Sequence, residues 1–130
     1  QERCGTCIRC LQACPTKALS MTVGLNSNRC ISYQTIEKKG EISEEIRPAL
    51  SGYVFGCDIC QDVCPWNSKK SIPTKHEEFR PQDEILKWGK DEWLSVQQEE
   101  FNRIFKTSAL RRAGFRKLRE NISYEYGKNS

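Results

Sequence analysis

Eight cysteines constrain the fold of this 130-residue chain more than any other feature, because seven of them fall in two short runs. The first run, Cys4, Cys7, Cys10 and Cys14 followed by Pro15, has the spacing C-x2-C-x2-C-x3-C-P. This spacing is typical of chains in which three thiolates hold one [4Fe-4S] cube and the fourth reaches a second cube. The two-residue gaps wrap the backbone around one cube, and the proline ends the local helix. The run therefore predicts two iron-sulfur clusters.

The second run consists of Cys57, Cys60 and Cys64 followed by Pro65, and it lacks a first cysteine. Counting back from the proline identifies Cys64 as the ligand that crosses to the other cube. The missing ligand would stand at Val54, which cannot coordinate iron, and the one thiol still unassigned is Cys30. We therefore expect Cys30 to complete the second set. The predicted ligands are Cys4, Cys7, Cys10 and Cys64 for the first cluster, and Cys14, Cys30, Cys57 and Cys60 for the second.

Zinc sites and disulfide frameworks are the alternative uses of these cysteines. Zinc sites usually combine two C-x2-C pairs or mix cysteine with histidine, and the third cysteine of each run disrupts that pattern. Closely spaced triplets that end in Cys-Pro are not typical of secreted disulfide frameworks. Because thiolate-bound iron survives in a reducing, oxygen-poor compartment, we expect a cytoplasmic protein without disulfides.

The composition indicates that apolar burial supplies only part of the stability. Hydrophobic residues make up 37% of the chain, the mean hydropathy is −0.70 and the net charge is +4. Cluster binding is expected to substitute for the missing core, so the chain without iron should be largely unfolded. No stretch approaches the roughly 18 apolar residues that a membrane span needs, which predicts no membrane association. Because the chain opens with Gln1 and reaches a cysteine motif at once, we expect it to be part of a longer protein.

The sequence predicts an α+β fold in three segments. Residues 1–68 would form a ferredoxin-like module with two [4Fe-4S] clusters, residues 69–90 a linker, and residues 91–130 a small α-helical region. Residues 19–23 and 53–55 are predicted as short strands. Ser95 and Gln98 have the spacing of a capping box, and Ser108 is predicted to cap a later helix. Apolar residues at helical spacing are predicted to form the core of the last segment: Phe101, Ile104, Phe105, Leu110, Phe115 and Leu118.

Positive charge is concentrated toward the C-terminus. Residues 67–130 carry fourteen basic and ten acidic side chains, whereas residues 1–66 carry seven of each. Seven basic residues fall within seventeen positions that contain no acidic residue: Arg103, Lys106, Arg111, Arg112, Arg116, Lys117 and Arg119. Such a stripe can follow the phosphates of a nucleic acid, and a solvated helix face is the alternative.

Three motifs taken together resemble the epoxyqueuosine reductase family. They are C-G-T-C-I-R-C-L-Q-A-C-P-T-K-A-L at residues 4–19, R-C-I-S-Y-Q-T-I-E at residues 29–37 and G-C-D-I-C-Q-D-V-C-P-W-N at residues 56–67. The resemblance extends to F-N-R-I-F-K-T-S-A-L-R-R-A-G at residues 101–114, so it covers most of the chain and includes Cys30. Ferredoxins share only the cysteine runs.

The resemblance implies a cobalamin-dependent oxidoreductase that reduces epoxyqueuosine to queuosine in the anticodon of a tRNA. Electrons would pass from a low-potential donor through two [4Fe-4S] clusters to the cobalamin. The catalytic residues and most of the cobalamin site would lie in an upstream domain outside these 130 residues, so the chain alone is expected to be inactive. The resemblance places Ser32, Thr35, Glu37, Cys57 and Asp58 in the vicinity of the corrin. The seven basic residues become candidate tRNA contacts, and we expect a monomer.

Three other functions stay open on the sequence. The chain could be a stand-alone dicluster ferredoxin-type electron carrier, the iron-sulfur module of another corrinoid enzyme such as a reductive dehalogenase, or an RNA-binding module with structural clusters. The segment around Cys30 is longer than a simple carrier needs. The wording of the motifs around Cys30 and Trp66 favours the tRNA-modifying enzyme over the dehalogenase.

Overall fold

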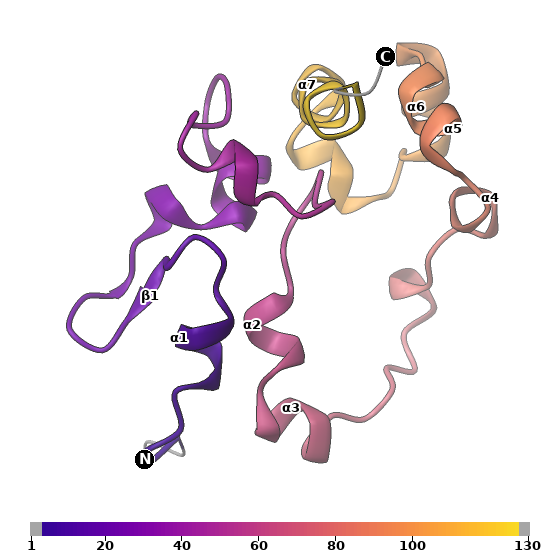
Figure 1. Ribbon diagram of the computed structural model, residues 1–130. Helices are drawn as coiled ribbons and strands as arrows, with labels where there is room; N and C mark the ends of the chain where they lie inside the picture. The colour runs from indigo at the N-terminus through magenta and orange to yellow at the C-terminus, as the bar shows by residue number, and fades with distance from the viewer. Residues whose placement is uncertain (1–3, 128–130) are drawn as a thin grey trace.

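The computed structural model describes residues 4–127, which form short helices and one small sheet (Figure 1). The α-helices are α1 (Arg9–Ala13), α2 (Ile59–Asp62), α3 (Pro65–Lys70), α4 (Asp83–Leu86), α5 (Lys90–Ser95), α6 (Gln98–Ile104) and α7 (Phe115–Tyr126). The tighter or wider helical turns are η1 (Ser27–Arg29), η2 (Tyr33–Glu37), η3 (Arg47–Ala49), η4 (Glu77–Phe79) and η5 (Ala109–Arg112). Strands β1 (Leu19–Ser20) and β2 (Gly24–Leu25) pair antiparallel, with Leu19 opposite Leu25. The predicted fold class, a ferredoxin-like module followed by a helical region, is confirmed.

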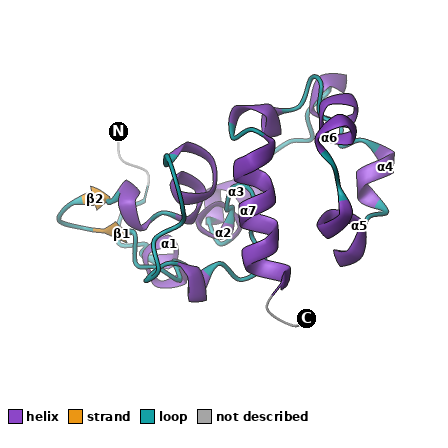
Figure 2. Cartoon of the chain, turned by 90° about the horizontal axis from the view of Figure 1, so that it is seen from above, coloured by secondary structure: helices purple, strands orange, loops and turns teal. Residues whose placement is uncertain are grey.

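Helix α7 lies between the cysteine-bearing module and the helices α4 to α6 (Figure 2). Within the module, α1 and α2 lie side by side (Figure 1). Each of them contains one cysteine of a run, Cys10 in α1 and Cys60 in α2. Helix α7 contacts η2 on one side and α5 on the other. Within residues 4–127, no helix combines the length and the apolar character that crossing a membrane requires.

A small apolar core supports the cysteine-bearing module. It consists of Ile31, Ile42, Ile46 and Leu50, all at most 5% exposed, with Tyr53, Cys57 and Tyr124 packed against them. Each such aliphatic side chain stabilises the fold by about 1.5–3 kcal/mol relative to its exposed state. The segment between the two cysteine runs therefore supplies the apolar core on which the module rests.

A second core holds the C-terminal helices together. Phe101, Ile104, Phe105, Leu118 and Ile122 are buried there, and Leu110 and Phe115 pack at its edge as half-buried side chains. The prediction that these apolar residues form a core is thus confirmed. The core also receives Ile85 and Trp88 from the predicted linker, and Val54 and Phe55 from the cysteine-bearing module.

The two predicted strands differ in outcome. Residues 19–23 begin as a strand at Leu19–Ser20, but the chain then turns and returns as β2. Residues 53–55 form no strand, so that prediction is wrong. The backbone bends there because Tyr53 packs on the first core while Val54 and Phe55 pack on the second.

The predicted capping box at Ser95 and Gln98 is also wrong. The Ser95 hydroxyl donates to the Glu92 carbonyl at 3.1 Å, and the carboxylate of Glu92 instead accepts from the Gly89 N–H at 2.8 Å where α5 begins. Ser108 does cap, since its hydroxyl oxygen accepts from the Leu110 N–H at 3.2 Å. The helix that it starts ends early because Gly114 takes φ 81°, a left-handed conformation that favours glycine, and α7 begins after it.

Candidate metal centres

The first cysteine run folds as a tight turn followed by a helix. The Cys7 N–H donates to the Cys4 carbonyl at 3.0 Å, which closes the turn, and Cys10 lies within α1. Cys14 ends that helix, with its N–H donating to the Cys10 carbonyl at 3.2 Å. Pro15 cannot donate a further helical hydrogen bond, so the chain leaves α1 at this point. The first three thiols and Cys14 are thereby directed to different places.

The second run repeats this arrangement around α2. Gly56, directly before Cys57, has φ 76°, so the sharp entry to the run uses a conformation that glycine adopts without strain. Cys60 lies within α2, and Cys64 precedes α3, whose first residue is Pro65. Proline suits the first position of a helix because the N–H it lacks would have no helical acceptor there.

The first cavity has a volume of about 370 Å³ and is bordered by one predicted ligand set. Its cysteine lining comprises Cys4, Cys7, Cys10 and Cys64, together with Cys60. Side chains of Leu19, Gln61 and Trp66 complete much of the wall. The structure therefore brings together one thiol from the second run and three from the first.

The second cavity has a volume of about 340 Å³ and is bordered by the other predicted set, Cys14, Cys30, Cys57 and Cys60. Cys30 reaches it from the turn between η1 and η2, sixteen residues after Cys14. The two cavities have nearly equal volumes, as two identical occupants would require. Four thiols around a space of this size are a donor set that suits an iron-sulfur cube.

Three residues border both cavities, namely Leu19, Cys60 and Gln61. The cavities are therefore neighbours with a common wall. Within residues 4–127, no three cysteine, histidine or acidic side chains converge as a single metal ion would need. The thiols instead surround two adjoining spaces.

The electrostatics of the second cavity reflect the closeness of its thiols. Burial raises the pKa of Cys57, and repulsion from the thiolates of Cys30, Cys60 and Cys14 raises it further. Burial also acts to raise the pKa of Cys14, but hydrogen bonds from the Thr16 hydroxyl and the Ala18 N–H outweigh it and leave that pKa lowered. The Ala18 N–H lies 3.2 Å from the Cys14 sulfur, and the Thr16 hydroxyl 3.5 Å. A cation in this space would relieve the repulsion.

The residues placed near the corrin by resemblance lie in three different surroundings. Ser32, Cys57 and Asp58 border the second cavity. Thr35 is fully buried, and its hydroxyl donates to the Ile31 carbonyl and accepts from the Gly56 N–H. Glu37 is exposed and forms a two-point ion pair with Arg112, at 2.6 and 3.0 Å.

The seven basic residues also differ in their surroundings. Lys117 is buried, and its ammonium donates to the Gly40 carbonyl at 2.6 Å. Three others pair with carboxylates: Arg103 with Glu84, Arg112 with Glu37 and Arg116 with Glu120. Lys106, Arg111 and Arg119 are exposed and form no ion pair with a carboxylate among the described residues.

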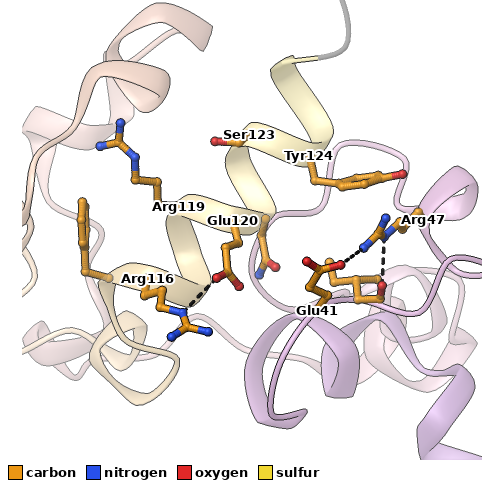
Figure 3. A pocket seen from close by; sticks show the side chains of 10 residues that line it. Glu41, Arg47, Arg116, Arg119, Glu120, Ser123 and Tyr124 are labelled. Carbon is orange, nitrogen blue, oxygen red and sulfur yellow. Dashed lines mark hydrogen bonds and ion pairs between the residues drawn. The ribbon is translucent and has the colours of Figure 1, made fainter.

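A larger cavity of about 620 Å³ lies between α7 and residues 41–47, away from the cysteines (Figure 3). Two ion pairs line this cavity, Arg47 with Glu41 at 2.5 Å and Arg116 with Glu120 at 3.0 Å. The Arg47 guanidinium also lies 4.5 Å from the centre of the Tyr124 ring. Neither cysteine nor histidine borders this cavity, so it does not carry the predicted metal chemistry.

Sequence reasoning missed several residues of the site. Leu19, Gln61 and Trp66 border the cavities, and the Thr16 hydroxyl is hydrogen-bonded to the sulfur of Cys14, a predicted ligand. Asn121 on α7 is buried at 1% exposure and contacts segments next to both Cys30 and Cys57. The position of Thr16, directly after Cys-Pro, is a local signal that could have identified it, whereas no local pattern identifies a partner 86 residues away.

Comparison with known proteins agrees with this geometry. Residues 3–67 match the family described as "4Fe-4S double cluster binding domain". An epoxyqueuosine reductase of Cellulophaga algicola is 39% identical over 123 residues, which are 95% of this chain and 40% of that relative. The Escherichia coli epoxyqueuosine reductase is 37% identical, covering 98% of this chain and 33% of the relative.

Solved structures give the same result. The structure of epoxyqueuosine reductase from Bacillus subtilis matches with a TM-score of 0.81 and 36% identity, over 96% of this chain and 33% of that one. A crystal structure of epoxyqueuosine reductase with an epoxyqueuosine-modified tRNA stem loop matches to the same extent. The chain spans between a third and two fifths of the length of these relatives. It belongs to the 4Fe-4S double cluster binding domain family and is homologous to the iron-sulfur region of epoxyqueuosine reductases.

Proposed function

We propose that this chain is the electron-relay part of an epoxyqueuosine reductase. When bound, the two [4Fe-4S] clusters supply one-electron transfer, and cobalamin, held mainly by other parts of the protein, supplies the reduction of the epoxide in tRNA. The observation that carries the proposal is the common wall of two cavities of similar size, each bordered by all four cysteines of one predicted set. Two redox groups held next to each other can exchange electrons, whereas separate structural clusters need no common wall.

The proposed ligands are Cys4, Cys7, Cys10 and Cys64 for the first cavity, and Cys14, Cys30, Cys57 and Cys60 for the second. Cys60 borders both cavities and is assigned to the second, because the first has four thiols without it. Its thiolate also contributes to the raised pKa of Cys57, which supports its place in that group.

Solvent exposure gives the relay a direction. Cys4 and Cys7 are exposed, whereas the four cysteines of the second set are all partly buried. We therefore assign electron entry from the low-potential donor to the first cavity. The second cavity, with Ser32 and Asp58 at its border, would face the cobalamin. Thr35 would support this border from the protein interior, since its side chain is buried.

Exposed basic side chains would contribute to tRNA binding. Lys106, Arg111 and Arg119 are the best candidates among the seven, because ion pairs or burial engage the other four. Replacing Lys106 and Arg111 together by Glu should weaken tRNA binding and reduce its salt dependence, since each phosphate contact adds about 0.7–0.9 to the salt slope. A matched control replaces the ion-paired Arg103 and Arg116 together by Glu and should change the salt slope less.

The test of the redox function uses a chimera, because this chain covers 33% of the Escherichia coli relative. This chain would replace the matched segment of that relative, and the protein would be loaded anaerobically with iron, sulfide and cobalamin. We expect queuosine to form on epoxyqueuosine tRNA when a low-potential reductant is supplied. The control chimera carries Cys7→Ala with Cys30→Ala and should form none.

Two outcomes would contradict the proposal. A chimera with full iron and cobalamin that forms no queuosine, while its clusters still accept electrons, would indicate a general carrier. Product formation at an unchanged rate in the control chimera would show that the clusters do not supply the electrons.

A further inference from the structure

Asn121 lies in the middle of α7 and contacts both of the segments that carry the isolated ligand Cys30 and its partner Cys57. Its side-chain amide donates to the Thr35 carbonyl and to the Val54 carbonyl, each at 2.9 Å. Thr35 lies five residues after Cys30, and Val54 lies three residues before Cys57. One side chain of the last helix is therefore connected to both segments.

The two acceptors have few other ways to be satisfied. Thr35 lies in η2, a turn of five residues, and the last carbonyls of a helix have no donor within it. Val54 lies in a bend without strand pairing. A buried carbonyl without a donor is unfavourable, so loss of the Asn121 amide favours movement of the two segments.

The Thr35 hydroxyl adds a second connection between the same segments. It donates to the Ile31 carbonyl at 2.8 Å and accepts from the Gly56 N–H at 3.0 Å. Ile31 directly follows Cys30, and Gly56 directly precedes Cys57. Asn121 and Thr35 together hold the backbone next to Cys30 and Cys57, two of the four cysteines that border the second cavity.

Two other contacts of α7 with the module are buried or partly buried, the Lys117 ammonium on the Gly40 carbonyl and the Tyr124 ring on the first core, and neither is a hydrogen bond to the segments next to Cys30 and Cys57. Further contacts of α7 and η5 lie at the surface. The Glu37–Arg112 pair is exposed, and the Glu125 carboxylate accepts from the Gly52 N–H at an exposed position. Water can replace such contacts at little cost. Asn121 is 1% exposed, so water cannot replace its amide without a rearrangement of the packing.

We propose that Asn121 is a positioning residue for the second cluster, acting through the backbone that carries Cys30 and Cys57. The inference rests on the proposed assignment of Cys14, Cys30, Cys57 and Cys60 to one cube. It predicts that the C-terminal helix is part of the second metal centre and that the first centre does not depend on it. Neither cavity is bordered by a residue of α7, so the helix would act on the second centre only through the backbone that Asn121 contacts.

The test compares Asn121→Leu with two reference variants after anaerobic reconstitution of the whole chain. Asn121→Leu keeps the approximate volume and removes both hydrogen bonds. We expect iron and sulfide to fall by about half, as for one of two cubes, and the remaining EPR and absorption spectra to match those of Cys30→Ala. They should not match those of Cys7→Ala, which removes a ligand from the first cavity.

A matched control separates positioning from general stability. Leu118→Ala changes a fully buried residue on the same helix whose partners are in the C-terminal core. It should lower the melting temperature and keep both cubes. Thr35→Val is a milder second variant that removes the hydroxyl and keeps the branched shape. It should speed the loss of the second cube to a chelator and leave the first cube unchanged.

Several results would overturn the inference. The first is full iron in Asn121→Leu, with the rate of iron loss to a chelator unchanged in both Asn121→Leu and Thr35→Val. The second is equal loss of both cubes in these variants. The third is selective loss of the second cube in Leu118→Ala. If Asn121→Leu does not fold, Asn121→Ser, which also removes the amide from both carbonyls, decides by the same chelator comparison. A Cys30→Ala chain that keeps all its iron would instead refute the ligand assignment, so the two failures are distinguishable.

Discussion

Replacing Cys30 by Ala tests the ligand assignment most directly. Cys30 is one of the four thiols around the second cavity, and it is separated from both cysteine runs in the sequence. An alanine cannot coordinate iron, so the variant should bind about half the iron and sulfide of the parent. Coordination through Cys14 and Cys30 also closes a segment of sixteen residues. A covalent cross-link over such a segment stabilises a fold by about 3 kcal/mol. Its loss should lower the melting temperature by about 10 °C.

The assay combines iron and sulfide analysis with EPR of the dithionite-reduced protein, prepared and measured without oxygen. Two reduced cubes in adjoining cavities interact magnetically, whereas one cube gives an uncoupled signal. Cys30→Ala should show the uncoupled signal of the first cube. Cys7→Ala is the matched control, because Cys7 borders only the first of the two cavities, and it should leave the cube of the second cavity. Full iron in Cys30→Ala, or equal loss of both cubes, would refute the assignment.

Three further predictions concern the electrostatics, the packing and the role of the metal. Thr16→Val removes the hydroxyl next to the Cys14 sulfur. It should lower the reduction potential of the second cluster by about 40 mV, since a hydrogen bond is worth about 1 kcal/mol. An unchanged potential in a spectroelectrochemical titration would contradict this. Phe105→Ala truncates a fully buried side chain that contacts Trp88, Trp93 and Phe101. It should lower the free energy of unfolding by about 3–5 kcal/mol in denaturant titrations, while the iron content stays constant. Removal of iron by a chelator should abolish hydrogen-exchange protection in residues 4–67 and preserve it in the core around Phe105, because that core contains no cysteine. This narrows the expectation of a largely unfolded iron-free chain to its cysteine-bearing part. Uniform loss of protection would show that the two parts unfold together.

The sequence predicted which thiols border each cavity because ligand spacing is a local property. Two-residue gaps and the proline after the last cysteine identify the member that leaves each run, and Cys30 followed by elimination. The same logic predicted the apolar core of the C-terminal region, where Phe101 and Phe105 recur at helical spacing. Coordination of iron by these thiols stays a prediction, as do the three segment boundaries, the corrin contacts and the tRNA contacts.

The errors have two causes, a distant contact at residues 53–55 and a competing local contact at Ser95. Residues 53–55 are aromatic and β-branched residues that favour a strand, but their side chains divide between two cores. The Val54 carbonyl accepts from Asn121, 67 residues away. Ser95 and Gln98 have the spacing of a capping box, but the Ser95 hydroxyl donates to the Glu92 carbonyl instead. The Glu92 carboxylate caps the start of α5. Asn121 itself occurs on a helix whose pattern gives no sign that a polar side chain there is buried.

The contact between Asn121 and Thr35 joins residues 86 positions apart, and this separation bears on the order of events during protein synthesis. The proposed ligands of the first cavity are all present once Cys64 has left the ribosome. The backbone next to Cys30 and Cys57 lacks the Asn121 amide until residue 121 has been synthesised, 57 residues after Cys64. Domains fold in the order of their synthesis, and contacts between distant residues form late. Iron delivery to the nascent chain can therefore succeed first at the first cavity. A chain whose synthesis stops before Asn121 would then hold one cluster instead of two.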